Sequence, residues 1–171
     1  ERIKGAHILL KEAPTILRKH RHLKLFFIGK SLEQDLYKKL IHLCARFSGQ
    51  LFYKKYLPKK ELFQYYYLSD IYVNSSLSES FSLSTHESAL CNNALLLNRL
   101  PVFGKFKDAA LFFDANCGDF SKKCDLLIRN LDLRKKLASE SMAIANKFVN
   151  NNKFKGNLCR LLDSFSERES C

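Results

Sequence analysis

The sequence predicts an α/β fold in which a parallel sheet carries helices on both faces. Short apolar segments, rich in aromatic and β-branched residues, alternate with segments of helical periodicity. The helical segments are about 10–16 residues long, a length typical of crossovers between parallel strands. A chain of 171 residues with 46% hydrophobic and 27% charged residues can form one domain with a real core.

The first half of the chain alternates helix and strand. Apolar residues recur every three or four positions over Gly5–Lys19, which predicts a helix. A continuous apolar run that ends at a glycine predicts a buried strand over Leu23–Ile28. The same two patterns predict a helix over Leu32–Phe47 and a strand over Leu51–Tyr53. A proline then opens a helix over Lys59–Leu68, because proline is tolerated in the first turn.

The second half continues the alternation and ends in helices. The apolar run Asp70–Val73 predicts a strand, and a serine-rich turn leads from it into a helix over Leu83–Cys91. Two further strands and two helices are predicted from the same patterns, at Ala94–Leu97, Ala109–Phe113, Phe120–Asn130 and Leu131–Val149.

We therefore expect residues 1–149 to form one domain, and residues 150–171 to form a C-terminal helix and tail. Three asparagines interrupt the pattern after the domain, and Phe154–Phe165 is the predicted last helix. Because the chain begins at Glu1 rather than Met, we expect an N-terminal part to precede it. No apolar run approaches the roughly 20 residues of a membrane helix, so no transmembrane segment is predicted.

The cysteines and histidines predict no metal site. None of the six cysteines has CxxC spacing, and the five histidines form no metal-binding motif beside them. A reducing compartment is the default for such a cysteine pattern, so we expect a cytoplasmic location.

The formal charge of +12 favours an anionic partner: a nucleic acid, an acidic membrane or a phosphorylated ligand. The densest basic segment, Lys54–Lys60, also contains an aromatic residue. It keeps open an alternative in which the chain is a basic α/β domain that binds RNA or DNA. Because the other lysines are scattered, a solvated basic surface is the favoured interpretation, and no nucleic acid is expected as a partner.

The segment Ser76–Leu90 predicts a ligand site. Glu79 lies on the loop after a strand, Ser82 is in position to cap the next helix, and Glu87 falls in its second turn. The amides at a helix start attract phosphate, and carboxylates accept hydrogen bonds from sugar hydroxyls. The pattern thus fits a phosphate-linked, hydroxyl-rich ligand, although two such glutamates also occur as ordinary helix and loop residues. His86 is expected on the helix surface.

The segment Asp70–Leu90 resembles the donor-site signature of the group 1 (family 4) retaining glycosyltransferases. That signature is a strand, a serine and then E-G-F-G-L-x-x-x-E-A-M. Four other stretches are similar to the same family in order and spacing: Lys4–Ala13, Leu23–Gly29, Leu57–Asp70 and Asp108–Asp114.

This resemblance implies a GT-B architecture of two Rossmann-like domains with the active site between them. The chain would be the C-terminal, donor-binding domain, with its first strand just before Glu1 and an N-terminal GT-B domain upstream. The implied reaction moves a hexosyl group from a UDP- or GDP-sugar to an unknown acceptor with retention of configuration. No cofactor or metal is implied, and the chain alone is expected to be inactive.

The resemblance also implies roles for individual residues. Glu87 would bind the ribose hydroxyls, Glu79 would sit beside the donor sugar as the catalytic residue, and Lys4 would neutralise the diphosphate. Gly29 would form a turn near the nucleotide. The diphosphate or sugar would meet the backbone amides of Ser80, Phe81, Ser82 and Leu83.

Two departures from the signature lie in this loop. The usual glycines on either side of the phenylalanine are Ser80 and Ser82, and serine tolerates a positive φ poorly. The alternative is therefore an inactive relative that kept the fold as a binding or scaffold domain.

Overall fold

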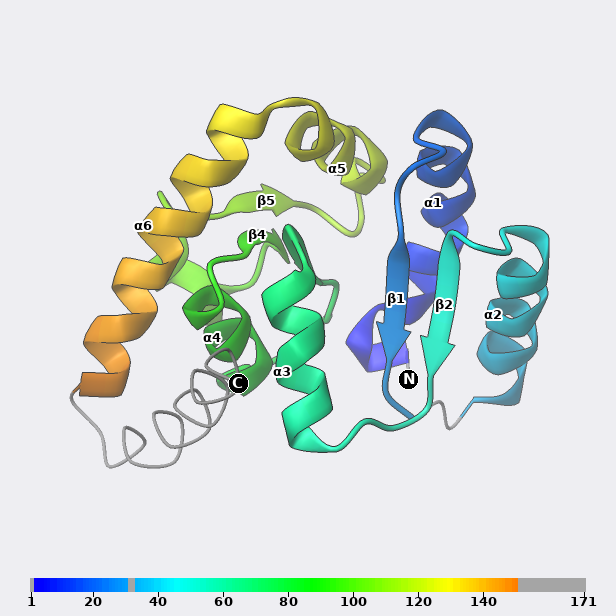
Figure 1. Cartoon of the computed structure of the whole chain (residues 1–171), viewed down its shortest axis with the longest axis horizontal. Helices are drawn as coiled ribbons and strands as arrows, with labels where there is room; N and C mark the ends of the chain where they lie inside the picture. The colour runs from blue at the N-terminus through cyan, green and yellow to red at the C-terminus, as the bar shows by residue number, and fades with distance from the viewer. Residues whose placement is uncertain (1, 31–32, 151–171) are drawn as a thin grey trace, which may run out of the picture.

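The computed structural model describes residues 2–30 and 33–150, and it has the predicted α/β fold (Figure 1). Strands and helices alternate through most of the chain. The strands are β1 (Leu25–Ile28), β2 (Leu51–Lys54), β3 (Ile71–Asn74), β4 (Ala94–Asn98) and β5 (Leu111–Phe113). The α-helices are α1 (Ala6–Lys19), α2 (Gln34–Arg46), α3 (Lys59–Leu68), α4 (Leu83–Leu90), α5 (Phe120–Arg129) and α6 (Leu131–Asn150).

These elements agree with the predicted ones to within about two residues at each end. Two short 3₁₀ helices were not predicted, η1 (Arg2–Lys4) and η2 (Pro101–Phe106). The predicted helix Phe154–Phe165 lies outside the described residues. Among the helices that the structure describes, none combines the length and the apolar character needed to cross a membrane.

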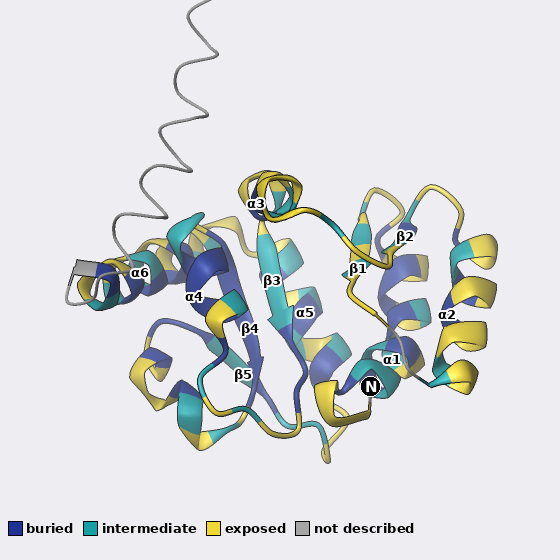
Figure 2. Cartoon of the chain, turned by 90° about the horizontal axis from the view of Figure 1, so that it is seen from below, coloured by how far each residue is buried: buried dark blue, intermediate teal, exposed yellow. Residues whose placement is uncertain are grey.

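All strand pairs are parallel, but the described strands form two sheets. β1 pairs with β2, with Leu25 opposite Leu51, and the second sheet has the order β3-β4-β5. In Figure 2 β3 is the strand of its sheet nearest to β1, and α3 connects β2 to β3. One continuous sheet was expected, and the division falls between β1 and β3.

Helices cover both faces of the sheet β3-β4-β5, as predicted. Along β4, Ala94 and Leu96 pack in one apolar cluster with α1 and α5. The alternate residues Leu95 and Leu97 pack in another with α4, η2 and α6. Every residue of β4 is buried, because this central strand has neighbours in the sheet on both sides (Figure 2).

Helix α1 joins the two sheets. Leu10, Ala13 and Leu17 pack with α2, β1 and β2 in a third cluster. Ile16, on a neighbouring face of the same helix, packs with β4 and α5. Because α1 contributes to both clusters, it sets how the two sheets lie relative to each other.

Candidate functional site

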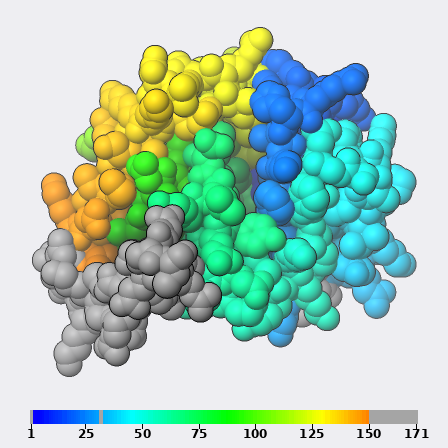
Figure 3. All heavy atoms as spheres, in the orientation of Figure 1, coloured from blue at the N-terminus to red at the C-terminus, as the bar shows by residue number. Residues whose placement is uncertain are grey.

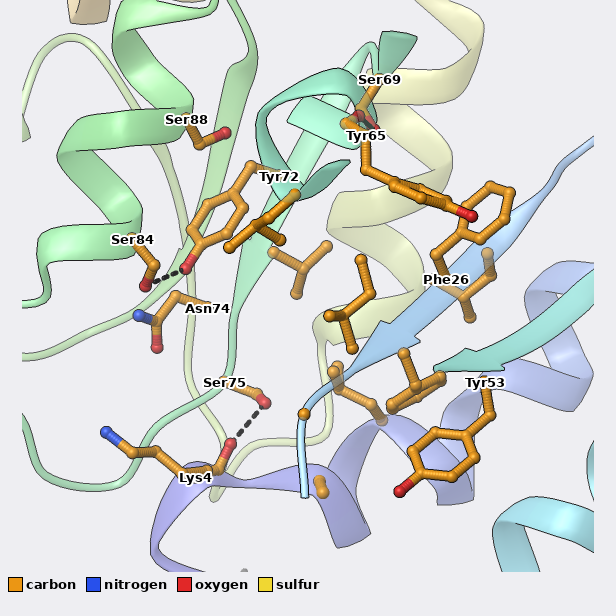
Figure 4. Close-up of a pocket in the computed structure, with 18 of the residues that line it drawn as sticks. Lys4, Phe26, Tyr53, Tyr65, Ser69, Tyr72, Asn74, Ser75, Ser84 and Ser88 are labelled. Carbon is orange, nitrogen blue, oxygen red and sulfur yellow. Dashed lines mark hydrogen bonds between the residues drawn. The ribbon is translucent and has the colours of Figure 1, made fainter. Parts of the chain in front are cut away.

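A cavity of about 890 Å³ lies between β1 and β3, and polar side chains line it near the carboxyl end of β3 (Figure 4). In parallel α/β sheets this edge is where ligands bind. The polar part of the lining comes from η1, from the end of β3 and the loop that follows, and from α4. Its members include Lys4, Asn74, Ser75, Ser76, Glu79 and Ser84.

The structure brings two of the predicted site residues, Lys4 and Glu79, into contact. Lys4 Nζ donates a hydrogen bond to Glu79 Oε1 at 2.8 Å, and the hydroxyl of Ser76 donates to the same oxygen at 2.8 Å. The Lys4 side chain is 54% exposed, whereas that of Glu79 is 12% exposed. The amine is therefore accessible to an incoming ligand while it holds the more buried carboxylate.

Glu79 is kept ionised by these contacts. Partial burial alone would raise its pKa, but the hydrogen bonds from Lys4 and Ser76 and the charge of Lys4 outweigh burial. The net result is a pKa below the usual value, because these bonds favour the charged form. At neutral pH the site therefore holds a lysine cation beside a carboxylate anion.

Backbone contacts fix η1 against the loop after β3. Leu77 N–H donates to the Ile3 carbonyl at 2.8 Å, and the Ser75 hydroxyl donates to the Lys4 carbonyl at 2.9 Å. Gly5 follows with a φ of +67°, and a Cβ built on it would lie 1.7 Å from the Ser75 carbonyl oxygen. Only a glycine permits this close approach, which places Lys4 beside the loop that carries Glu79.

Two buried asparagines shape that loop. Asn74 accepts a hydrogen bond from the backbone N–H of Ser76 at 2.9 Å. Asn98, at the end of β4, donates to the Ser76 carbonyl at 2.8 Å and accepts from the backbone N–H of Ala115 at 3.0 Å. The loops after β3, β4 and β5 are thus tied together at the carboxyl edge, which holds Glu79 in place.

Ser82 adopts the left-handed conformation that a glycine would be expected to occupy, with a φ of 59°. Its hydroxyl accepts a hydrogen bond from the Asn74 amide at 2.9 Å and bonds the Thr85 hydroxyl at 2.8 Å. These buried bonds compensate for a conformation that costs an L-residue about 1–2 kcal/mol. Ser82 therefore has the positive φ usual for a glycine, although serine tolerates a positive φ poorly.

The predicted capping role of the Ser82 hydroxyl is wrong. Ser82 is the N-cap residue of α4, but within the described chain its side chain makes no capping hydrogen bond. With the positive φ, the hydroxyl instead bonds Asn74 and Thr85. The amide of Thr85 donates to the Ser82 carbonyl at 3.1 Å.

The predicted surface position of His86 is also wrong, because its side chain is buried against the loop. Its ring stacks on Phe81 with centroids 4.5 Å apart and an interplanar angle of 7°. Its Nδ1–H donates to the Ser82 carbonyl at 3.0 Å, and Nε2 has no hydrogen-bond partner among the described residues. Burial lowers the pKa of His86 and nearby Lys105 lowers it further, although the bond to Ser82 opposes them. His86 is therefore a neutral residue that positions the Phe81–Ser82 backbone.

Phe81 packs against the end of α6 rather than into the cavity. Its ring centroid lies 5.1 Å from that of Phe148, and Lys105 Nζ lies 4.9 Å from both centroids. Phe81 can thus offer its backbone to a ligand while its side chain anchors the loop.

Glu87 lies in the second turn of α4, as predicted, but another side chain already contacts it. Its side chain is 6% exposed, and Oε1 is 3.2 Å from Nζ of Lys59, which begins α3. The Lys59 side chain is 56% exposed. The carboxyl group of Glu87 is therefore buried and is in contact with a half-exposed lysine.

Lys4, Gly29 and Glu79 line the cavity, whereas Glu87 and the segment Ser80–Leu83 lie outside its lining. Sequence reasoning missed Asn74, Asn98 and Lys59, because their roles depend on contacts between elements distant in the chain. Asn98 carried a weak signal, since it is a polar residue that ends an apolar strand. In the described part of the chain, no three His, Cys, Asp or Glu side chains are grouped so that they could hold a metal ion.

Comparisons with known proteins agree with this architecture. A family model described as glycosyl transferases group 1 matches residues 1–142. No curated protein matches the chain in sequence. Among solved structures, the C-terminal domain of a glycosyl transferase group 1 family protein (LpcC) from Francisella tularensis is 19% identical with a TM-score of 0.76. The match covers 86% of this chain and 80% of that domain.

Two longer structures share the fold. Anabaena Alr3699/HepE in complex with UDP-glucose is 16% identical with a TM-score of 0.73, and the match covers 98% of this chain and 46% of that one. An E. coli structure described as trehalose-6-phosphate bound with UDP-2-fluoro glucose is 19% identical with a TM-score of 0.70. That match covers 95% of this chain and 41% of that one, so the chain spans less than half the length of either protein.

Proposed function

Because the chain belongs to the glycosyl transferases group 1 family, we propose that it is the donor-binding domain of a retaining glycosyltransferase. The donor would be a UDP- or GDP-sugar, and the group transferred a hexosyl unit. The observation that carries the proposal is the contact between Lys4 and Glu79 at the carboxyl edge of the strands, beside an open cavity.

Lys4 is suited to bind the diphosphate of the donor. Its amine is half-exposed and is already held at the site by Glu79. During transfer, negative charge grows on the departing nucleotide diphosphate, and a positioned ammonium group stabilises that charge. The charge-assisted hydrogen bond contributes about 1.5–3 kcal/mol, which is about 10- to 100-fold in affinity.

Glu79 is suited to face the sugar. It is ionised at neutral pH, so it can accept hydrogen bonds from sugar hydroxyls. Glycosyl transfer passes through a transition state with positive charge near the anomeric carbon, and a nearby carboxylate stabilises that charge. We therefore assign Glu79 the catalytic role beside the sugar, and Lys4 the role of stabilising the departing nucleotide diphosphate.

Glu87 is suited to hold the ribose of the nucleotide. Its carboxyl group is buried, and Lys59, whose side chain is half-exposed, contacts it from the surface. Two ribose hydroxyls can donate to the carboxylate, which accepts through both oxygens. The backbone of Ser80–Leu83, between the two glutamates, would face the diphosphate or sugar.

The rest of the reaction belongs to the full-length protein. In a GT-B enzyme the acceptor binds to the N-terminal domain, so we propose that this chain binds donor but does not turn it over alone. The Anabaena protein is described in complex with UDP-glucose, which supports a UDP-sugar as the first donor to test.

Calorimetric titration of the full-length protein with UDP and GDP tests the proposal. Lys4→Met should weaken binding of the matching nucleotide by about 10- to 100-fold. Lys11→Met is the matched control, because Lys11 is an exposed lysine on α1 and its replacement should leave binding unchanged. If neither nucleotide binds, or if Lys4→Met binds as tightly as the unmodified protein, the proposal is wrong.

Catalysis is tested separately from binding. Glu79→Gln should retain nucleotide binding while hydrolysis or transfer of the donor sugar falls. A full-length protein that binds nucleotide and yet neither transfers nor hydrolyses any UDP- or GDP-hexose would instead be the inactive binding domain.

A further inference from the structure

The outward face of α2 carries basic and apolar side chains together. We propose that this face docks on an anionic phospholipid surface. The docking face, the α2 surface, consists of one arginine of α1 and five exposed residues of α2: Arg18, Tyr37, Lys38, Lys39, Ile41 and Arg46. The inference concerns a part of the molecule outside the candidate site and is independent of whether that site binds a nucleotide.

The apolar residues on this face are not needed to hold the helix in place. The opposite face of α2 packs with α1, β1 and β2 through residues such as Leu40 and Leu43, which are buried. On the outward face, Tyr37, Ile41 and Ala45 recur one helical turn apart and are all exposed. The exposed fraction is 44% for Tyr37 and 42% for Ile41. A short apolar stripe therefore faces away from the core.

Basic side chains flank this stripe. Lys38, Lys39 and Arg46 are exposed residues of α2. Helix α1 adds Arg18, because its Cζ lies 5.9 Å from the ring centroid of Phe47 and the Cζ of Arg46 lies 5.7 Å from the same centroid. The end of α1 and the end of α2 thus present their arginines around one aromatic ring.

The positive charge of the α2 surface is not balanced locally. Within residues 2–30 and 33–150, Arg18, Lys38, Lys39 and Arg46 form no ion pair. Asp35 is the one acidic residue of α2. Cations gathered on one surface repel each other, and an extended anionic partner relieves that repulsion. The charge of the surface is therefore complementary to that of a polyanion.

An anionic lipid surface provides a counterpart for both kinds of side chain. Lipid phosphates attract the cations, and each Lys or Arg near such a surface strengthens binding about fivefold. The apolar side chains of Tyr37 and Ile41 can enter the boundary between headgroups and acyl chains. A nucleic acid would also attract the cations and could stack a base on Tyr37, but Ile41 and Ala45 offer no aromatic face for stacking. The combination therefore favours lipid.

The position of α2 makes its outward face available for docking. In Figure 1 and Figure 3, α2 lies at one end of the molecule, and its outer side is drawn as exposed in Figure 2. Its inner residues Leu36 and Leu40 line the cavity beside β1. The outward face consequently points away from that cavity, so docking through the α2 surface would leave the cavity uncovered.

Co-sedimentation of the full-length protein with vesicles tests the charged part of the proposal. We expect binding to vesicles of equal parts phosphatidylcholine and phosphatidylglycerol, and little binding to phosphatidylcholine alone. Lys38→Gln combined with Lys39→Gln should weaken binding about 10- to 30-fold. Lys122→Gln combined with Lys135→Gln is the matched control, because it removes the same charge at exposed positions of α5 and α6 and should leave binding nearly unchanged.

The apolar part is tested by one further pair of variants. Ile41→Ser should weaken binding to the anionic vesicles about three- to tenfold, because the isoleucine would leave water when the helix docks. Leu126→Ser is the matched control, since Leu126 of α5 is 43% exposed and Ile41 is 42% exposed. The control should bind the vesicles like the unmodified protein.

Four results would overturn the inference. The unmodified protein could fail to bind the anionic vesicles, or the control variants could weaken binding as much as the α2 variants do. Ile41→Ser could bind like the unmodified protein, which would mean that the face does not enter the lipid. Finally, Lys38→Gln with Lys39→Gln could weaken binding of a single-stranded oligonucleotide, measured by fluorescence anisotropy, and leave vesicle binding intact. The partner would then be a nucleic acid.

Discussion

Replacing Gly5 with alanine should destabilise the protein more than the same change at Gly49. Both glycines have a positive φ, +67° at Gly5 and +80° at Gly49. A Cβ at Gly49 meets no atom within 4 Å, whereas a Cβ at Gly5 would lie 1.7 Å from the Ser75 carbonyl oxygen. Gly49→Ala therefore measures the backbone strain alone, and Gly5→Ala measures that strain together with the close approach.

The expected loss in the free energy of unfolding depends on which segments each added Cβ would push apart. Left-handed backbone costs an alanine about 1–2 kcal/mol, which is the whole effect expected for Gly49→Ala. At Gly5 the contact is half the 3.4 Å at which ordinary contacts begin, so η1 and the loop after β3 must separate. Separation breaks the bonds from Leu77 to Ile3 and from Ser75 to Lys4, each contributing about 1 kcal/mol. We therefore expect Gly5→Ala to lower the free energy of unfolding by about 3–4 kcal/mol.

Urea unfolding monitored by circular dichroism measures both variants against the unmodified protein. The expected result is a lower midpoint for both, with the shift at Gly5 about twice that at Gly49 and with similar slopes. Equal shifts would refute the reasoning, because they would mean that the contact between Gly5 and Ser75 does not constrain the fold.

Three further predictions concern residues in the loop between β3 and α4 and in the helix that follows it. Ser82→Ala should cost about 0.5–1.5 kcal/mol in urea unfolding, because it removes the shorter of the two hydrogen bonds that the buried Asn74 amide donates, and the bond to Thr85 remains. Ser80→Ala, at an exposed position, should cost little. The pKa of His86 in the folded protein lies below the ordinary value of 6.5, so on acidification the unfolded chain takes up the proton first. The free energy of unfolding should therefore fall as the pH drops below 6.5. In His86→Gln, the urea midpoint should no longer show this fall. The pKa of Glu79 in the folded protein lies below the ordinary value of 4.5. Its contribution to stability is therefore present above pH 4.5 and is lost as the pH falls through the folded-state pKa. The difference in free energy of unfolding between the unmodified protein and Glu79→Gln should disappear over that pH range.

Most of the secondary structure could be predicted from local patterns. Helix α3 has the predicted bounds Lys59–Leu68, because a proline and an apolar periodicity mark it within one short stretch. The 3₁₀ helix η2 escaped prediction because Pro101–Phe106 has no period that separates it from a loop. The division into two sheets also escaped prediction, since strand pairing depends on neighbours far apart in the chain.

The candidate site was predicted in part, and the misses share one cause. Lys4 and Glu79 were identified separately by resemblance, and their contact joins residues 75 positions apart. Ser82 was expected to cap α4, but its hydroxyl bonds Asn74 and Thr85 because of the left-handed backbone. His86 was expected at the surface, but its ring is buried by Phe81 of the preceding loop, Phe106 of η2 and Phe148 of α6.

The amino-acid sequence by itself determined the order of helices and strands, the α/β class and the position of Glu79 and Glu87 on either side of a helix start. These follow from periodicity, turn residues and side-chain chemistry, which act over a few neighbouring positions. The tertiary structure alone decided that Lys4 meets Glu79, that Lys59 meets Glu87 and that a serine keeps a glycine-like turn. The physical reason is that each of these outcomes rests on hydrogen bonds and packing between distant segments, and such contacts exist only once the chain has folded.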